Sequence, residues 1–254
     1  MKSSSVFDKA YSRLYKMILA GEIPAGERLL EIPLSERMRV SRTTIRNVFA
    51  RLKEDGLVEN SDGGGLRVRR ISKDELLEMF EFRIMIEPYC VRRVAEKANP
   101  EVIGMLEKYL QTFRLLRDRV QKSPPKEIYD HFLNEYFFTD MAFHLSLVRE
   151  GGNRVIFNTV KKLYVLSNIL IIHSGFNLFE KVLSPKNFYA QLYREHEEIY
   201  HRVHEKDGEG ASRAMAAHLG YVRDMLCKHI LDDRPPEGDR TEAIDEIYNF
   251  LARQ

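Results

Sequence analysis

The sequence has few cysteines and no long apolar run, and each shortage argues against a class of protein. Its two cysteines, Cys90 and Cys227, do not form a CxxC pair, which argues against a disulfide framework and a thiolate zinc site. Residues 1–16 lack the apolar core of a signal peptide. The most apolar stretch, 163–172, is interrupted by polar residues and is too short to cross a bilayer. We therefore expect a cytoplasmic protein without a membrane partner.

Signatures of common enzyme families are also missing. The sequence contains no P-loop lysine, no dinucleotide-binding glycine pattern and no GxSxG. Residues 196–200 resemble the HExxH zinc motif, but Tyr200 stands where the second histidine is required. We expect that the protein is not an enzyme. A metal with open coordination positions can still activate water, so a metal-dependent hydrolase stays an alternative.

Charge is distributed unevenly along the 254 residues. Residues 1–70 contain 14 Lys and Arg against 9 Asp and Glu, whereas the remainder contains 26 against 29. The basic excess therefore lies at the N-terminal end. The length suits two domains, and 44% hydrophobic residues suffice for a core. This distribution predicts a basic module with a polyanion partner, joined to a mildly acidic module.

Residues 40–60 predict a helix suited to a DNA major groove. Ser41 is a favourable N-cap, apolar residues follow at helical spacing, and Asp55-Gly56 ends the helix. The side away from the apolar face presents Arg42, Thr43, Arg46 and Asn47. Guanidinium, hydroxyl and amide groups can bond to phosphates and base edges. Taken alone, the segment is equally compatible with an ordinary amphipathic helix that has a solvated basic face.

The neighbouring segments predict a winged helix-turn-helix domain over residues 1–71. Helical spacing indicates two shorter helices before the basic one. After it, residues 57–60 and 66–69 alternate like strands around a glycine-rich tip at 61–65. Three helices followed by a basic hairpin make up this fold.

Three motifs in residues 6–70 together resemble a known family. They are ILAGEIPAGERLLE, LSERMRVSRTTIRNVFARLKEDGLVE and GGGLRVR, and they are similar to the DNA-binding domain of the GntR family of bacterial regulators. The resemblance implies that the start of the third helix reads double-stranded operator DNA and that the wing tip enters the minor groove. The residues it implicates are Ser41, Arg42, Thr43, Thr44 and Arg46 on the helix and Gly64 and Gly65 on the wing.

Two features of this sequence change which DNA contacts the family resemblance predicts. Some members have an arginine on the strand entering the second helix, where this chain has Glu31-Ile32-Pro33, so that contact should be absent. The wing also has few polar side chains beside its glycines. We therefore expect backbone or shape contacts at the wing.

Residues 72–232 predict an all-α domain, which makes the whole chain mainly α. A capping box begins at Ser72, and no later stretch alternates convincingly. The predicted helices cover residues 73–97, 100–122, 125–150, 153–174, 185–205 and 208–232. Residues 233–254 predict a linker and an amphipathic helix, and a second subunit is one candidate for what this helix packs against.

Four residues of the helical domain predict a metal site. Asp140 and His144 lie one helical turn apart and point the same way. His196 and His218 lie on successive helices, which would place them opposite each other if those helices are antiparallel. One carboxylate and three imidazoles favour a divalent transition metal, Zn, Ni, Mn or Fe, over Mg. The simpler interpretation of each residue alone is a core or surface polar side chain.

Three further motifs support the metal site. FRIMIEPYCVRRVAEKA, FFTDMAFHLSLVREGGNRVI and REHEEIYHRVHEKDGEGASRAMAAHL are similar to the ligand-binding domain of the FadR subfamily of GntR regulators. In its metal-binding members an Asp and a His one turn apart and two later His are the ligands, which implies Asp140, His144, His196 and His218 here. An organic acid completes the metal's shell in related domains. Arg83 is our candidate for a second anchor of its carboxylate, the alternative being a structural pair with Glu87.

These observations predict a homodimeric bacterial transcription regulator, nucleoid-associated when bound to DNA. A small carboxylate metabolite at the metal would modulate operator binding. A regulator that senses the metal alone stays an alternative. An acyl-type ligand without metal is disfavoured by the complete ligand set, and a hydrolase does not account for the wing.

Overall fold

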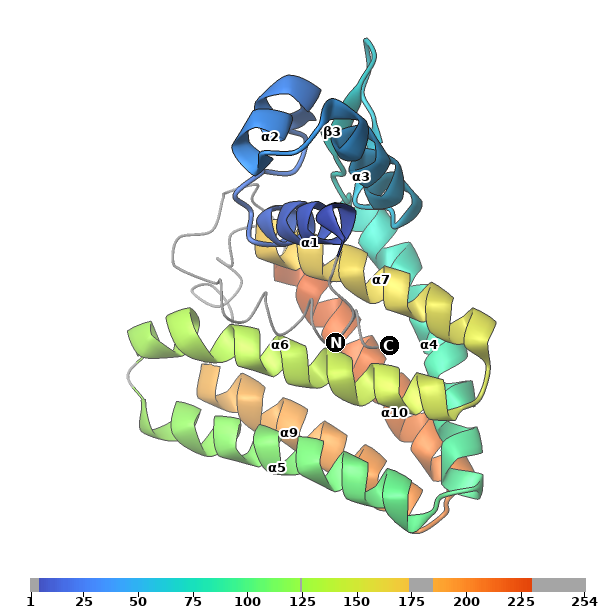
Figure 1. Ribbon diagram of the computed structural model, residues 1–254. Coiled ribbons are helices and arrows are strands. Elements are labelled where there is room, and N and C mark those ends of the chain that lie inside the picture. Colours follow the sequence, from blue (N-terminus) through green and yellow to red (C-terminus); the bar gives the residue numbers. More distant parts are fainter. Residues whose placement is uncertain (1–4, 124, 174–184, 230–254) are drawn as a thin grey trace. The chain divides into compact units, whose positions relative to one another are not determined.

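The computed structural model describes residues 5–123, 125–173 and 185–229, which belong to two compact units (Figure 1). The first unit runs to Ser72 and includes α7 (Arg154–His173) from Val165 onward. The second begins at Lys73 and contains the other helices after it. The domain limits at 71 and 232 stay predictions, and the predicted linker and terminal helix at 233–254 lie outside the described residues.

Up to Ser72, the first unit combines three helices with a small sheet. Its helices are α1 (Val6–Leu19), α2 (Glu31–Met38) and α3 (Arg42–Glu54). The backbone N–H of Thr44 donates to Ser41 Oγ at 3.0 Å, so Ser41 caps α3 as predicted. The predicted apolar face is buried, and it consists of Ile45, Val48, Phe49 and Leu52. Burial of this face leaves the opposite side of α3 at the surface.

The sheet contains one strand more than the predicted hairpin. β2 (Val58–Asn60) and β3 (Leu66–Val68) pair antiparallel and form the wing. β1 (Arg28–Leu29) adds to the other edge of β3, so the strand order is β1-β3-β2. A strand of two residues has too little alternation to be recognised in a sequence. The unit is therefore a winged helix-turn-helix, as predicted.

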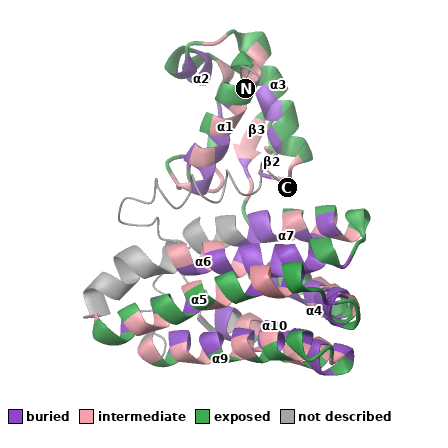
Figure 2. Cartoon of the chain, turned by 60° about the horizontal axis from the view of Figure 1, so that its bottom comes forward, coloured by how far each residue is buried: buried purple, intermediate pink, exposed green. Residues whose placement is uncertain are grey.

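The second unit consists of long helices that pack face to face. They are α4 (Lys73–Glu96), α5 (Pro100–Lys122), α6 (Pro125–Glu150), the first part of α7, α9 (Pro185–His204) and α10 (Gly208–His229). Within this unit α4 packs against α10, and α5 packs against both α6 and α9. The buried residues gather on the faces that the helices turn toward each other (Figure 2). The prediction of an all-α bundle is confirmed for the described residues.

A tight turn between α9 and α10 positions two of the predicted ligands. Lys206 adopts a left-handed backbone conformation with φ 59°, and the N–H of Asp207 bonds back to the carbonyl of Arg202. The chain thereby reverses, and α9 and α10 pack against each other. His196 and His218 consequently face one another with ring centroids 4.5 Å apart. In the part of the chain that the structure describes, no helix has the length and apolarity needed to cross a membrane.

Candidate metal centre and nucleic-acid interface

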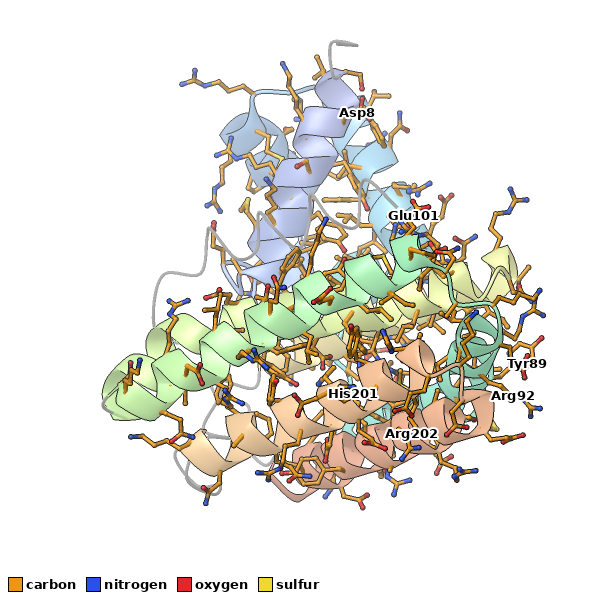
Figure 3. All side chains as sticks on the ribbon, turned by 90° about the horizontal axis from the view of Figure 1, so that it is seen from below. Asp8, Tyr89, Arg92, Glu101, His201 and Arg202 are labelled. Carbon is orange, nitrogen blue, oxygen red and sulfur yellow. The ribbon has the colours of Figure 1, made fainter. Side chains whose placement is uncertain are left out.

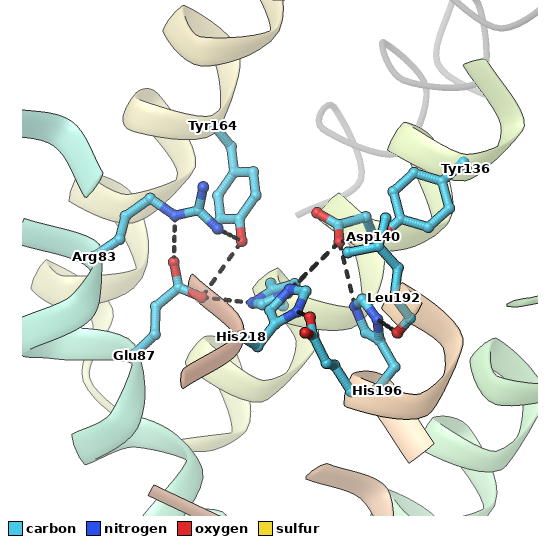
Figure 4. Close-up of polar contacts among 10 residues, drawn as sticks. Arg83, Glu87, Tyr136, Asp140, Tyr164, Leu192, His196 and His218 are labelled. Atoms are coloured by element: carbon cyan, nitrogen blue, oxygen red, sulfur yellow. Dashed lines mark hydrogen bonds and ion pairs between the residues drawn. The ribbon is translucent and has the colours of Figure 1, made fainter. Parts of the chain in front are cut away.

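Four side chains from three helices converge in the core of the second unit. Asp140 and His144 come from α6, His196 from α9 and His218 from α10, and each offers a ligand atom within 4.8 Å of the others (Figure 4). The Nε2 atoms of His196, His144 and His218 lie 3.2, 3.7 and 3.9 Å from Asp140 Oδ1. The three imidazoles are buried, and Asp140 is the partly exposed member. The predicted residues thus come together, and their role as metal ligands stays a prediction.

Each imidazole in this cluster is oriented by a hydrogen bond at its other nitrogen. The three bonds, all from Nδ1, are His144 to Glu87 Oε2 at 2.7 Å, His196 to the carbonyl of Leu192 at 2.8 Å and His218 to Glu195 Oε2 at 2.8 Å. A carbonyl or a carboxylate accepts, so the hydrogen of each neutral ring belongs on Nδ1. Each Nε2 is then left with a lone pair that points into the shared space.

That arrangement suits a cation. His144 Nε2 and His218 Nε2 lie 3.1 Å apart, where two lone pairs repel each other. His196 Nε2 is buried and has no hydrogen-bond partner. Burial and then the neighbouring imidazoles hold the pKa of His218 well below its ordinary value, so this ring is neutral at pH 7. Three imidazole nitrogens and one carboxylate oxygen make a donor set that a divalent transition metal accepts.

The ionisation of Asp140 also favours a cation. Burial alone would raise the pKa of this carboxyl, but positive charge on the adjacent imidazoles, first His144 and then His196, outweighs burial and holds the pKa below its usual value. When the rings are neutral, a bound cation would supply that positive charge instead. Tyr136, one turn earlier on α6, donates its hydroxyl to Asp140 Oδ1 at 3.2 Å. The carboxylate is therefore charged and held toward the imidazoles.

Arg83 forms the structural ion pair with Glu87 that was the alternative to its role as an effector anchor. Its Nε donates to Glu87 Oε1 at 2.6 Å, and its Nη2 donates to the hydroxyl of Tyr164. The guanidinium carbon lies 4.7 Å from the ring centroid of Phe80 and 3.9 Å from that of Tyr164. The structural pair with Glu87 is thus present. An effector carboxylate would have to bind the terminal nitrogens of Arg83, and this contact stays a prediction.

The residues that orient the ligands were missed by the sequence analysis. Glu87 was considered only as a partner of Arg83, and Glu195 and Tyr164 were not singled out. Glu195 directly precedes His196 in the sequence, but it bonds to His218 on the next helix, which no local pattern indicates. Asn153 caps the start of α7, because its Oδ1 accepts the N–H groups of Val155 and Ile156.

Other histidines behave as ordinary surface residues. His201 and His204 lie on α9 with exposed side chains, and Figure 3 labels His201. The side chains of His131, His173 and His229 lie outside the described residues, as does that of Cys227. Cys90 is buried, and burial raises the pKa of its thiol to about 11, which makes it unreactive at neutral pH.

In the first unit, the predicted DNA-reading residues lie on the uncovered side of α3. Ser41, Arg42, Thr43 and Arg46 are exposed and Thr44 is half-buried. The Nε of Arg46 donates to Glu31 Oε2 at 2.8 Å, so α2 holds this arginine from the side. Such a contact restricts the guanidinium before it meets DNA. Contact of the five residues with DNA stays a prediction.

Three consecutive glycines, which have no side chains, form the end of the wing tip. Gly63, Gly64 and Gly65 have φ values of 87°, 90° and 83°, and a Cβ at Gly63 or Gly64 would meet no atom within 4 Å. Glycine is favoured in this conformation, and the tip is consequently thin. Arg28 of β1 lies beside it, because its Nη2 donates to the carbonyl of Gly64 at 2.5 Å. The sequence analysis missed Arg28 because it missed β1.

Arg28 and Arg67 both lie at the wing, but they differ in whether a carboxylate compensates their charge. Arg67 of β3 pairs with Glu59 at 2.8 Å and with Asp62 at 3.3 Å, so its charge is largely compensated. Arg28 is exposed and forms no ion pair with a carboxylate of the described residues. Gly64 and Gly65 therefore have an uncompensated cation beside them, which an approaching polyanion would meet.

Comparisons with known proteins find a matching family for each of the two units. Residues 78–221 match the family described as the FCD domain, and residues 7–68 match bacterial regulatory proteins of the gntR family. The chain is 26% identical to the uncharacterized HTH-type transcriptional regulator YdhC of Bacillus subtilis, over 91% of this chain and 95% of that protein. It is 27% identical to the HTH-type transcriptional repressor RspR of Escherichia coli K12, over 87% of this chain and 89% of that protein.

A solved structure shows the same fold. Escherichia coli McbR/YncC superposes with a TM-score of 0.68 at 16% identity, covering 89% of this chain and 99% of that one. The FCD match alone spans more than half of the sequence, and the match of the DNA-binding domain covers most of what precedes it. The chain therefore belongs to the GntR family of transcription regulators, with an N-terminal DNA-binding winged helix-turn-helix and a C-terminal FCD domain.

Proposed function

We propose that this regulator is a homodimer whose FCD domain binds a divalent transition metal and a small carboxylate effector that modulates operator binding. One observation carries the proposal: three buried imidazoles, each with its hydrogen directed outward from the cluster, turn their Nε2 atoms toward one carboxylate. Without a cation this arrangement opposes lone pairs in a medium of low dielectric constant. With one, every buried nitrogen has a partner.

In this proposal Asp140, His144, His196 and His218 hold Zn, Ni, Mn or Fe. The metal supplies positive charge and open coordination positions for an anionic oxygen. Other residues would orient the ligands by hydrogen bonds. Glu87, Glu195 and the Leu192 carbonyl orient the three imidazole rings, and Tyr136 orients the Asp140 carboxylate. Because Asp140 is the ligand that is partly exposed, we infer that the effector approaches from its side.

The DNA-binding unit would act in pairs. One recognition helix contacts only a few base pairs, so two copies related by a two-fold axis would read a pseudo-palindromic operator with half-sites about one helical turn apart. Ser41, Arg42, Thr43, Thr44 and Arg46 would contact the major groove, and Gly64 and Gly65 the minor groove. The protein would act in the cytoplasm, at the nucleoid when bound to DNA.

A regulator that senses the metal alone is the second candidate. The near-complete burial of the three imidazoles favours it, because a structural metal is usually enclosed. A hydrolase has less support. Glu87 and Glu195, the carboxylates nearest the imidazoles, both accept hydrogen bonds from ligand rings and are not placed as general bases.

The experiment that tests the proposal measures DNA binding in the presence of carboxylates. A duplex selected by the wild-type protein from a randomised library serves as the probe, and fluorescence anisotropy reports its affinity for zinc-loaded protein with and without a panel of small mono-, di- and tricarboxylates. We expect at least one carboxylate to change the affinity for wild type, and none to do so for His196→Ala.

His201→Ala is the matched control, since His201 lies on the same helix with an exposed side chain. It should respond like wild type. A carboxylate response that persists in His196→Ala would refute the proposed site. A response of wild type to zinc, with none to any carboxylate, would favour the metal sensor.

A further inference from the structure

The metal site described above draws all four ligands from α6, α9 and α10. α4 provides no ligand, although it is the helix that continues directly from the DNA-binding unit: Ser72 ends that unit and Lys73 begins α4. What α4 does provide is Glu87, whose side chain is fully buried and whose Oε2 lies 2.7 Å from His144 Nδ1. Glu87 therefore joins a ligand on α6 to the helix that leads to the DNA-binding unit (Figure 4).

Glu87 is itself held firmly on its own helix. Its Oε1 accepts from Arg83 Nε at 2.6 Å, one turn earlier on α4, and its Oε2 also accepts from the Tyr164 hydroxyl at 3.3 Å. Arg83 is buried beside Phe80, also on α4, and beside the ring of Tyr164. Both carboxylate oxygens are thus engaged, so a displacement of His144 would be transmitted to α4 through short, charge-assisted bonds.

Glu195 offers a natural comparison. It contacts His218 Nδ1 at 2.8 Å, nearly the distance of the Glu87 contact, but it lies on α9. Its other oxygen accepts from Gln191, also on α9, at 2.7 Å. Both glutamates orient a ligand ring in the same way. They differ in the helix to which they tie that ring.

We propose that Glu87, held by Arg83 and Tyr164, is a positioning residue that couples the metal site to α4 and thereby to DNA binding, whereas Glu195 serves metal binding alone. This inference rests on the proposed metal site. A bound metal withdraws electron density from the His144 ring, which strengthens the hydrogen bond from Nδ1 to a carboxylate. Metal binding therefore favours the setting of α4 in which this bond is shortest, and that setting is what DNA binding would sense.

The test compares Glu87→Gln with Glu195→Gln. The amide oxygen of glutamine still accepts from Nδ1, but the negative charge is removed. For each protein we would measure the zinc Kd by competition with a chelator. We would also measure the ratio of DNA Kd values without and with saturating zinc, on a duplex selected by the wild-type protein. Zinc affinity should fall in both variants, by about 10- to 100-fold.

The ratio of DNA affinities separates the two roles. Wild type and Glu195→Gln should show the same ratio, whereas in Glu87→Gln it should fall toward one. Glu87→Gln leaves the buried Arg83 without its partner and could unfold, so Tyr164→Phe is the second variant. It keeps the ring beside Arg83, leaves no charge unpaired and should lower the ratio in the same direction.

Each other outcome overturns the inference. If the ratio of DNA Kd values falls equally in Glu87→Gln and Glu195→Gln, both glutamates act only through metal binding. An unchanged ratio in Glu87→Gln and Tyr164→Phe would mean that coupling takes another path. Zinc binding by wild type with a ratio of one would refute the coupling and leave the metal site standing, whereas absence of zinc binding would refute both.

Discussion

The Nε2 atoms of His144 and His218 lie 3.1 Å apart in the core of the FCD domain, although each ring has its hydrogen bonded at Nδ1 to a carboxylate. Two lone pairs at this distance repel each other unless a cation lies between them. The Nε2 of His196 in the same cluster is buried, forms no hydrogen bond within the described residues and lies 3.2 Å from Asp140 Oδ1. Stability, ligand binding and regulation should therefore all depend on metal at this site.

Removal of the metal should destabilise the FCD domain. A ligand that binds only the folded state adds about 4 kcal/mol when its concentration is 1,000 times its Kd, and without it the lone-pair repulsion returns. Differential scanning calorimetry should show a lower Tm after treatment with a chelator and recovery on addition of zinc. In His218→Ala the chelator should change the Tm little. An equal change in wild type and in this variant would place the metal elsewhere.

Arg46→Ala should abolish specific operator binding. Arg46 is exposed on α3, and the contact of its Nε with Glu31 leaves its terminal nitrogens for base edges or phosphates. A good bidentate contact discriminates between bases by about 1–3 kcal/mol, and a dimer loses two such contacts. Anisotropy with the selected duplex and a scrambled one measures the specificity. Arg51→Ala, at the other end of α3, is the control, and specificity retained in Arg46→Ala would refute the assigned helix.

Arg28→Ala should weaken DNA binding by roughly thirtyfold, because a dimer loses two contacts, each at the low end of the 1–3 kcal/mol typical of a specific contact. Its guanidinium lies at the carbonyl of Gly64, and a narrow minor groove attracts such a cation. We expect wild type to prefer A·T pairs beneath the wing, where the minor groove is narrow, and Arg28→Ala to lose this preference. For wild type, inosine·cytosine pairs should substitute for A·T pairs there, because inosine lacks the guanine amino group that occupies the minor groove.

The control for this prediction is Arg13→Ala, an exposed arginine on α1. It should leave both affinity and sequence preference unchanged. If Arg28→Ala lowers the affinity for every duplex equally, Arg28 binds phosphate rather than the groove, and the assignment to the minor groove is wrong.

Added salt should weaken DNA binding steeply, because each phosphate contact releases condensed counterions. The logarithm of the affinity should fall with the logarithm of salt concentration by roughly 0.9 for each phosphate contacted. Anisotropy between 50 and 200 mM salt, the range over which such losses are pronounced, gives the slope. A slope near zero would contradict a role for the basic excess at the N-terminal end.

Local physics explains which parts of the fold could be predicted. The cap at Ser41 and the apolar periodicity of α3 involve neighbours within a few residues, so the sequence reveals them. Asp140 and His144 are visible for the same reason, since one helical turn separates them. β1 could not be predicted, because a strand of two residues shows no alternation of polar and apolar residues. Its pairing with β3 also joins segments that are far apart in the sequence.

The orienting residues of the metal site could not be predicted for a related reason. Glu87 meets His144 across 57 positions and Tyr164 meets Arg83 across 81, and only the packing of α4 against α6 and α7 brings them together. The pairing of Arg83 with Glu87 could be foreseen because the two residues lie one helical turn apart. The bond from Glu87 to the ring of His144 on another helix could not be foreseen.

The measurement that tests the central claim most directly is the metal content of the protein, purified without an affinity tag, by elemental analysis. Wild type would be compared with His218→Ala and, as a control, with His201→Ala. We predict close to one transition-metal ion per chain in wild type and in His201→Ala, and little in His218→Ala. Wild-type protein that contains no metal, even after incubation with zinc or nickel, would contradict the account.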